Sequence, residues 1–406
     1  MLRSLRPQYA QAFHCIGPDC EDTCCQGWDV MIDRESFQQL EALPRFQPKI
    51  EEHLVVIKNP SPSEYARVQL TPASTCPFLS PDRWCSIQQE HGERYLPEIC
   101  ATYPRATRRI DGLRETALLL ACPEAARLVL LNPDLVQPEE PGVSRYFRFS
   151  HLGEHPVKGN GAPHQFLWEL RAFTMLLLRD RDYPLWQRLF LLGMFSRRLN
   201  GLADAGQIEL VPQLLKEHSQ MIVEGKLRSA MDGIPVRTGA RLAMLLELIQ
   251  RHLKTTAGQH PRFRECVKDF LNGIHCDEGA AIENCASFYE DDDSQYCAPF
   301  LKEHPYMLEN CLVNYVFRSR FPYGVDARGK PSTPLTDFLM MCILYTLVRD
   351  LMVGASGIYR ENLNSSHVVK IVQSVAKSVE QCPKFPLADY ASLANADGFA
   401  LLLKTR

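Results

Sequence analysis

The sequence lacks an apolar stretch long enough to cross a membrane. Its longest apolar run, FLMMCILYTLV at 338–348, lies between Asp337 and Arg349 and falls far short of the roughly 20 residues that a bilayer crossing requires. The first residues, MLRSLRPQYAQAF, contain no apolar segment of a secretory signal. We therefore expect a buried helix at 338–348 and a cytoplasmic protein without a membrane partner.

The chain also lacks an excess of charge of either sign. Its 45 Lys and Arg residues nearly balance its 48 Asp and Glu residues, and the formal net charge is -3. Arg105, Arg108 and Arg109 form a short basic stretch that we interpret as the solvated face of a strand. Such a balance provides no general attraction for polyanions, so no nucleic-acid partner is expected.

Several common catalytic motifs are missing. The single Gly-x-Gly, Gly159-Asn160-Gly161, lies in a Pro- and Gly-rich segment and does not follow a predicted strand, as a dinucleotide-binding turn would. There is no Gly-x-Ser-x-Gly, His-Glu-x-x-His or phosphate-binding loop. The Cys-x3-Cys-x2-Cys triplet of radical S-adenosylmethionine enzymes is also absent, because Cys25 follows Cys24 directly.

Cysteine, in contrast, is abundant, and its distribution is uneven. A reducing compartment disfavours structural disulfides, so clustered thiols there indicate metal binding or redox chemistry. The 15 cysteines include one group near the start and a later set that is spread singly through predicted helices, where they are expected to be buried. The early group comprises Cys15, Cys20, Cys24, Cys25, Cys76, Cys85, Cys100 and Cys122.

The periodicity of apolar residues predicts two regions of different fold class. Residues 1–135 are expected to form an α+β, cysteine-rich domain with short strands near 28–33, 53–57 and 66–70 and a hairpin at 107–120, whose turn is Asp111-Gly112. Residues 136–162 are rich in Pro, Gly and charge and are predicted to be a linker. In residues 163–406 apolar side chains recur every three to four positions, which predicts a mostly α-helical domain.

The early cysteines form three arms that can converge on a metal. Cys20, Cys24 and Cys25 form the first arm, a Pro-rich loop with Cys76 and Cys85 the second, and Cys100 the third. Thiolates suit zinc or an iron–sulfur cluster, although the spacing differs from that of common zinc ribbons. Because Cys24 and Cys25 are adjacent, we expect them to point in different directions and one of them to bind metal. Reduced, buried thiols are the alternative, which the surrounding Glu, Asp, Pro and Gly residues disfavour.

These segments carry a family resemblance. The stretches HCIGPDCEDTCCQGWDVMID, CPFL, WCSIQQEHGERYLPEICATYPR and LACPEAARLVLL, with SFYEDDDSQYCAPFLKEHPYMLENCLVNYVFRSRFPYG further on, resemble the flagellin lysine-N-methylase family. The cysteine-rich front is similar to that of a wider group described as zinc- or iron-chelating cysteine-cluster proteins. The resemblance covers most of the chain, and the cysteine frame is its most specific part.

The resemblance implies an enzyme that uses S-adenosylmethionine to methylate lysine side chains of flagellin and carries a 4Fe–4S cluster in its cysteine domain. It implies cluster ligands among Cys20, Cys24 or Cys25, Cys76, Cys85 and Cys100, with Cys15 and Cys122 as further candidates. Two other functions remain open at this point. One is a non-enzymatic interaction module held together by zinc, and the other is an iron–sulfur redox protein.

Methyl transfer to lysine places demands on a site. The ammonium group, with an ordinary pKa of about 10.4, must lose a proton before its nitrogen attacks a methyl group, which requires a carboxylate, a tyrosine or desolvation. Tyr103, next to the third arm, and Asp291 and Tyr296, in an acidic stretch, are the catalytic candidates. The alternative for the acidic stretch is a solvated loop without a catalytic role.

Four residues are candidates for cofactor binding. Trp28 and Arg105 lie near the cysteines in the sequence, and Arg105 can bind a sulfur atom or a cofactor carboxylate. Asn310 and Asn314 lie within a predicted helix on a face rich in aromatic residues, where buried amides need partners. Trp28 is alternatively a core residue, and the two amides can equally fasten one helix to another.

Overall fold

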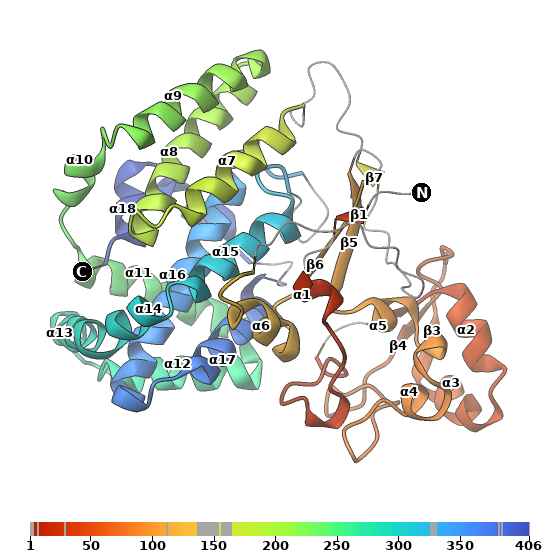
Figure 1. Cartoon of the computed structure of the whole chain (residues 1–406). Coiled ribbons are helices and arrows are strands. Elements are labelled where there is room, and N and C mark those ends of the chain that lie inside the picture. Colours follow the sequence, from red (N-terminus) through yellow and green to blue (C-terminus); the bar gives the residue numbers. More distant parts are fainter. Residues whose placement is uncertain are drawn as a thin grey trace. The chain divides into compact units, whose positions relative to one another are not determined.

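The computed structural model describes residues 4–5, 8–27, 30–110, 113–135, 154–155, 165–324, 331–380, 382 and 385–405. The chain divides into two compact units (Figure 1). Unit 1 comprises Met1–Ala125 with Val136–His155, and unit 2 comprises Ala126–Leu135 with Pro156–Arg406. The predicted linker at 136–162 lies outside the described residues except for Glu154–His155, which form a short strand. Trp28 and Gly159–Gly161 also lie outside them.

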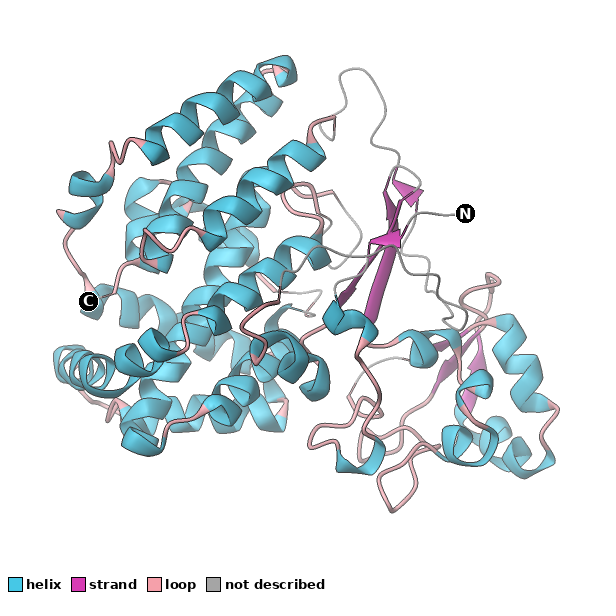
Figure 2. Ribbon diagram, in the orientation of Figure 1, coloured by secondary structure: helices cyan, strands magenta, loops and turns pink. Residues whose placement is uncertain are grey.

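The described part of unit 1 contains two small sheets (Figure 2). One has the order β1-β6-β5-β7, in which β5 and β6 form an antiparallel hairpin and β1 and β7 add parallel strands at its sides. The other is antiparallel, with the order β2-β4-β3. The short strands and the hairpin that the sequence predicts are therefore confirmed. The strands are β1 (Ser4–Leu5), β2 (Met31–Ile32), β3 (Leu54–Val56), β4 (Ala66–Val68), β5 (Arg105–Ile110), β6 (Leu113–Leu118) and β7 (Glu154–His155).

Short helices surround an apolar core in unit 1. The core includes Ile32, Leu40, Phe46 and Phe78, and Cys76, Cys85 and Cys100 pack against it. Three of the eight early thiols are therefore anchored by burial of apolar side chains, the main favourable term in folding. The helices are α1 (Gln8–Gln11), α2 (Arg34–Glu41), α3 (Gln47–His53), α4 (Ser86–His91), α5 (Glu98–Thr102) and α6 (Pro123–Leu130), and the division between the units falls within α6.

Unit 2 is built almost entirely from helices, as the sequence predicts (Figure 2). They are α7 (Leu167–Arg179), α8 (Leu185–Asp204), α9 (Val211–Val223), α10 (Arg228–Asp232), α11 (Thr238–Leu253), α12 (Pro261–Gly273), α13 (Ile282–Asp292), α14 (Ala298–Glu303), α15 (Tyr306–Ser319), α16 (Pro334–Tyr359), α17 (Ser365–Val375) and α18 (Ala396–Leu403). A π-helical turn, η6 (Asp293–Cys297), joins α13 to α14.

Helix α16 forms the core of unit 2. The expectation that this segment is too short for a membrane span is wrong, because by length and composition the helix would suffice for one, but 89% of its apolar window is buried inside the protein. The predicted buried helix at 338–348 is thus confirmed as part of α16. Helix α12 crosses it closely, since a Cβ placed on Gly273 would lie 1.8 Å from the carbonyl oxygen of Gly354. Glycine at this crossing permits backbone contact between the two helices.

Candidate functional site

All eight early cysteines line one cavity in unit 1. The cavity has a volume of about 310 Å³. Its wall brings together the three arms predicted from the sequence and also the two further candidates, Cys15 and Cys122. The thiols that line it are those of Cys15, Cys20, Cys24, Cys25, Cys76, Cys85, Cys100 and Cys122.

The first and second arms are joined by backbone hydrogen bonds. The N–H of Cys76 donates to the carbonyl of Cys25 at 2.8 Å, and the N–H of Gly27 donates to the carbonyl of Ser74 at 3.0 Å. Gly27 has a φ of +80°, a left-handed conformation that glycine adopts without strain. This short antiparallel contact fixes the position of Cys25 relative to Cys76.

The second arm also turns on itself before α4. The N–H and the hydroxyl of Ser86 both donate to the carbonyl of Phe78, at 2.8 and 2.9 Å. Cys85 is consequently placed at the start of α4, where backbone N–H groups of Ile87 and Gln88 are within reach of its sulfur. Cys100 lies within α5, which begins one residue after Pro97, and its backbone N–H donates to the Pro97 carbonyl at 2.9 Å.

The thiols differ in acidity. A hydrogen bond from the Cys25 thiol, together with backbone hydrogen bonds, outweighs burial and lowers the pKa of Cys85 to about 7. Burial raises the pKa of Cys76 to about 11 and that of Cys122 to about 12. Because the thiolate is the metal-binding form, Cys85 is better prepared to bind a cation than Cys76 or Cys122, which would ionise as a cation binds.

Cys24 and Cys25 lie closer together than the sequence suggested. Their side chains share a hydrogen bond, which is the largest contribution to the raised pKa of Cys25. The expectation that the two thiols point in different directions is therefore wrong, because the loop turns enough to bring both to the same cavity. The assignment of one of them as the ligand stays a prediction.

The eight thiols are distributed over the cavity wall. Among the described residues, no three Cys, His, Asp or Glu side chains lie close enough together to hold a single ion.

Tyr103 and Arg105 also line the cavity. Burial raises the pKa of Tyr103 well above its usual range, so its hydroxyl stays protonated at neutral pH and can donate a hydrogen bond. The Arg105 side chain donates from Nη2 to the carbonyl of Phe13 at 3.0 Å and lies 4.9 Å from the centre of the Phe13 ring. Arg105 thereby holds the segment that leads to Cys15.

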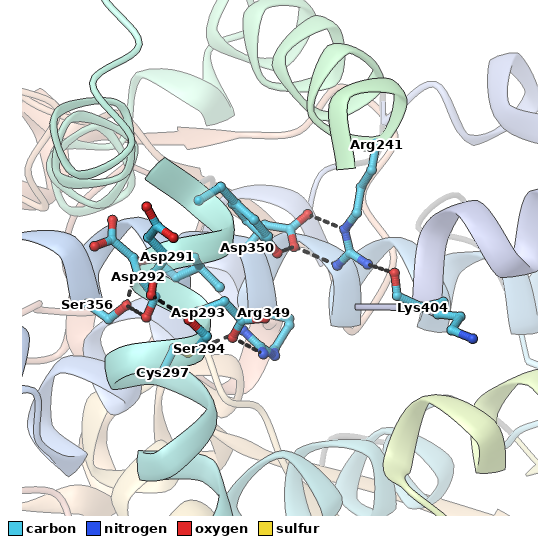
Figure 3. A network of polar contacts seen from close by, with 12 residues as sticks. Arg241, Asp291, Asp292, Asp293, Ser294, Cys297, Arg349, Asp350, Ser356 and Lys404 are labelled. Atoms are coloured by element: carbon cyan, nitrogen blue, oxygen red, sulfur yellow. Dashed lines mark hydrogen bonds and ion pairs between the residues drawn. The ribbon is translucent and has the colours of Figure 1, made fainter. Parts of the chain in front are cut away.

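The acidic stretch of unit 2 is helical, so the expectation of a loop is wrong (Figure 3). Asp291 is exposed and Tyr296 is half-buried. Burial raises the pKa of Asp292 to about 6. Asp293 is buried in an ion pair with Arg349 at 2.5 Å, and Arg349 also donates to the sulfur of Cys297 at 3.2 Å. Apolar packing around η6 buries part of this stretch, which its composition did not reveal.

The two candidate amides of α15 are both buried. Nδ2 of Asn310 donates to the carbonyls of Val129 and Asn132, at 3.0 and 2.7 Å, and so binds the C-terminal end of α6. This is the helix-fastening role that the sequence left open for this residue. Asn314 lies one turn further along α15. A role of either amide in cofactor binding stays a prediction.

The cavity wall contains residues that the sequence did not single out. Trp84, Arg83, Asp22 and Glu124 all contribute to it. Each lies within two residues of a cysteine in the chain. That proximity was the available signal, but a side chain next to a cysteine can point toward the cavity or away from it, and the chain fold decides which.

Comparison with known proteins identifies the class of enzyme. The lysine-N-methylase of Salmonella choleraesuis is 23% identical over 382 residues, covering 91% of this chain and 89% of the relative. That of Salmonella typhimurium is 22% identical with the same coverage. The chain is therefore an enzyme of the protein-lysine N-methyltransferase class.

The family follows from a match of the helical region. The model of the FliB lysine N-methylase C-terminal domain matches residues 171–400, more than half of the chain, and the chain belongs to this family. The flagellar biosynthetic protein FliU of Salmonella muenchen is 29% identical over 131 residues, which are 32% of this chain and 77% of the relative. No solved structure matches the chain significantly.

Proposed function

We propose that the protein transfers methyl groups from S-adenosylmethionine to lysine side chains of flagellin in the cytoplasm, with an iron–sulfur cluster held by the cysteines of unit 1. One observation supports the cluster above all: eight thiols line a single cavity of about 310 Å³. The methylase relatives and the flagellar name of a third relative support the reaction and the substrate.

The ligands proposed for a 4Fe–4S cluster are Cys76, Cys85 and Cys100, together with Cys24 or Cys25. The first three pack against the core of unit 1, which gives them a fixed position. Rigid placement of ligands lowers the conformational entropy that binding must remove. Cys15, Cys20 and Cys122 line the rest of the cavity and remain candidates.

A bound cluster would supply an iron coordination position or an electron. The protein side chains around it have separate roles. Arg105 places a cation at the cavity wall and holds the Phe13 carbonyl, and Tyr103 provides a neutral hydroxyl as a donor. These groups suit the carboxylate of a methionine moiety, the chemistry expected of the methyl donor.

The proposed reaction requires proton removal and bond exchange. A base takes one proton from the lysine ammonium group, and the freed nitrogen pair forms a bond to the methyl carbon. The bond from this carbon to sulfur breaks, and its electron pair stays on sulfur, so the sulfonium becomes a neutral thioether. Asp291 and Tyr296 remain the proposed groups for the proton, whereas burial keeps the Tyr103 hydroxyl protonated and gives it the role of a donor. Asp292 joins them, since with a pKa of about 6 it is largely ionised at pH 7 and still basic.

The direct test is a methylation assay. The protein is purified without oxygen, its iron and sulfide are counted, and it is incubated with flagellin and S-adenosylmethionine that carries a labelled methyl group. We expect labelled N-methyl-lysine in flagellin digests, and none when flagellin with acetylated lysines is supplied. A protein that carries its full complement of iron and yet leaves every lysine unlabelled would refute the proposal.

The same preparation discriminates between the two other functions. A colourless protein with stoichiometric zinc would support a zinc-binding interaction module and contradict the cluster. A brown protein whose cluster is reversibly reduced, but which transfers no methyl group, would indicate a redox protein. Anaerobic metal analysis together with the label therefore assigns the chain to one of the three functions.

A further inference from the structure

Trp84 lies in the wall of the cysteine cavity, within a hydrogen-bonded turn. It lies between Arg83 and Cys85, in a tight turn where the N–H of Ser80 donates to the Trp84 carbonyl at 2.8 Å and the Ser80 hydroxyl accepts from the Trp84 N–H at 3.2 Å. Arg83 donates from Nη2 to the carbonyl of Cys20 at 2.6 Å. The turn that presents the indole is thus connected to the first cysteine arm.

The indole also packs closely against the backbone before Cys20. A Cβ placed on Gly17 would lie 3.4 Å from Cε2 of Trp84, and Gly17 has a φ of +58°. Glycine permits both this conformation and the approach of the ring. The Ser80 hydrogen bonds therefore fix the backbone of Trp84, and its indole ring lies against Gly17 at the cavity.

The indole nitrogen has an unmet requirement. Nε1 of Trp84 is buried and has no hydrogen-bond partner among the residues that the structure describes. The indole N–H is a donor and cannot accept. Buried donors in native proteins nearly always have a partner, because an unsatisfied one is costly. An acceptor supplied by a ligand of the cavity would satisfy it.

We infer that the indole N–H of Trp84 donates a hydrogen bond to a sulfur atom of the iron–sulfur cluster, either a bridging sulfide or a cysteine ligand. The inference rests on the proposed function, since it requires the cluster. Sulfur is the acceptor that such a cluster presents over most of its surface, and eight cysteines line this cavity. Trp84 is thus a positioning residue that adjusts the cluster electronically.

The hydrogen bond has a measurable consequence. A donor near the sulfurs stabilises the reduced, more negative state more than the oxidised state, so it raises the reduction potential. Trp84→Phe keeps an aromatic ring against Gly17 and removes the N–H. We expect the variant to retain its iron and to be about tenfold harder to reduce, a shift of about 59 mV to lower potential for a one-electron couple. Trp186→Phe, the same exchange in unit 2 at a residue outside the cavity wall, should leave the potential unchanged.

A second measurement keeps Trp84 in place. The complete protein is prepared with ¹⁵N-labelled indole and with Trp84 as its single tryptophan, the others being replaced by Phe. Pulsed electron paramagnetic resonance of the reduced cluster should then detect a ¹⁵N coupling and an exchangeable proton. A cluster-bearing protein without this coupling, or a Trp84→Phe protein with an unchanged potential, overturns the inference and leaves the proposed function intact. A wild-type protein without iron overturns both.

Discussion

The carboxylate of Asp33 accepts a hydrogen bond from the backbone N–H of Glu98 at 3.0 Å, across 65 residues of chain. The same carboxylate accepts from the N–H of Ser36 at 2.8 Å and caps the start of α2. One carboxylate therefore accepts hydrogen bonds from backbone N–H groups in the first turns of two helices, α2 and α5. Since α5 carries Cys100, this pairing couples the local fold of α2 to the geometry of the cysteine cavity.

Replacing Asp33 should loosen both helices. We expect Asp33→Ala to lower the free energy of unfolding of unit 1 by about 1–3 kcal/mol, because two backbone donors lose their acceptor, and to reduce the iron retained after gel filtration. Asp33→Asn, which keeps one acceptor oxygen, should lose less unfolding free energy and less iron. Equal unfolding midpoints for Asp33→Ala and the wild type in denaturant titrations would contradict the proposed role.

The Asp33 contribution should depend on pH. Burial acts to raise the pKa of Asp33, but the hydrogen bonds from Ser36 and Glu98 outweigh it, so the pKa lies below its ordinary value. A depressed carboxyl pKa gives stability that is present above the pKa of the unfolded chain, about 3.9, and is lost as the pH falls through the folded pKa. The difference between the wild type and Asp33→Ala should therefore be full at pH 7 and shrink below about pH 4.

Single Cys→Ser replacements should separate ligands from bystanders. We expect Cys76→Ser, Cys85→Ser and Cys100→Ser each to lose most of the bound iron, since their fixed sulfurs are the proposed ligands. Cys276→Ser, at a half-buried cysteine of unit 2, is the control and should retain it. Iron and sulfide per chain, measured on anaerobically purified protein, decide the outcome. Full iron in Cys85→Ser would remove that residue from the ligand set.

Unit 2 contains a buried ion pair whose disruption should be severe. Arg241 and Asp350 approach to 2.5 Å (Figure 3), with side chains that are 2% and 0% exposed. The Tyr289 hydroxyl donates to the same carboxylate at 2.6 Å. Asp350→Ala leaves a buried guanidinium without its partner and should lower the free energy of unfolding by about 3–5 kcal/mol. The double variant Arg241→Met with Asp350→Leu should recover much of this loss. Chemical denaturation of the wild type and of the two variants measures this recovery, and a double variant no more stable than Asp350→Ala would contradict it.

Asp337 should give unit 2 a pH dependence of the opposite sign. Burial raises the pKa of Asp337 to about 6 although Ser332 and the N–H of Gly324 donate to it. A raised carboxyl pKa gives stability that is present below the unfolded pKa and is lost as the pH rises through the folded pKa. Between about pH 4 and pH 6 we expect a loss of about 2–3 kcal/mol from this residue. Asp337→Asn should flatten that part of the stability profile, and an unchanged slope would argue against the assignment.

Replacing Asn310 tests whether this residue fastens α15 to α6 or binds the cofactor. Asn310→Leu removes the donor to Val129 and Asn132 and should cost about 1–3 kcal/mol of unfolding free energy, because two carbonyls lose their partner. If fastening α6 is its whole role, the affinity for S-adenosylmethionine, measured by calorimetry on folded protein, should not change. A large loss of affinity with unchanged stability would instead support the cofactor role predicted from the sequence.

Much of the fold could be predicted because it depends on local patterns in the sequence. The three-to-four spacing of apolar residues predicted the helices of unit 2, and the Asp111-Gly112 turn signal predicted the β5–β6 hairpin. The prediction for the acidic stretch at 287–296 was wrong, because its composition indicated a loop. In the structure it is helical, and Asp293 is buried against Arg349, a residue more than fifty positions away. Long-range pairs of this kind leave no periodic signal in the sequence.

The candidate site shows the same division. The sequence by itself determined that eight early thiols exist in three arms, because thiol chemistry and chain spacing are local properties. Only the tertiary structure decided that Cys15 and Cys122 face the same cavity as the others and that Cys24 and Cys25 share a hydrogen bond. It also decided that Trp84 lines this cavity and that its indole N–H is buried. The physical reason is that side-chain direction in irregular loops follows from backbone hydrogen bonds and packing between segments far apart in the chain, as between Cys25 and Cys76.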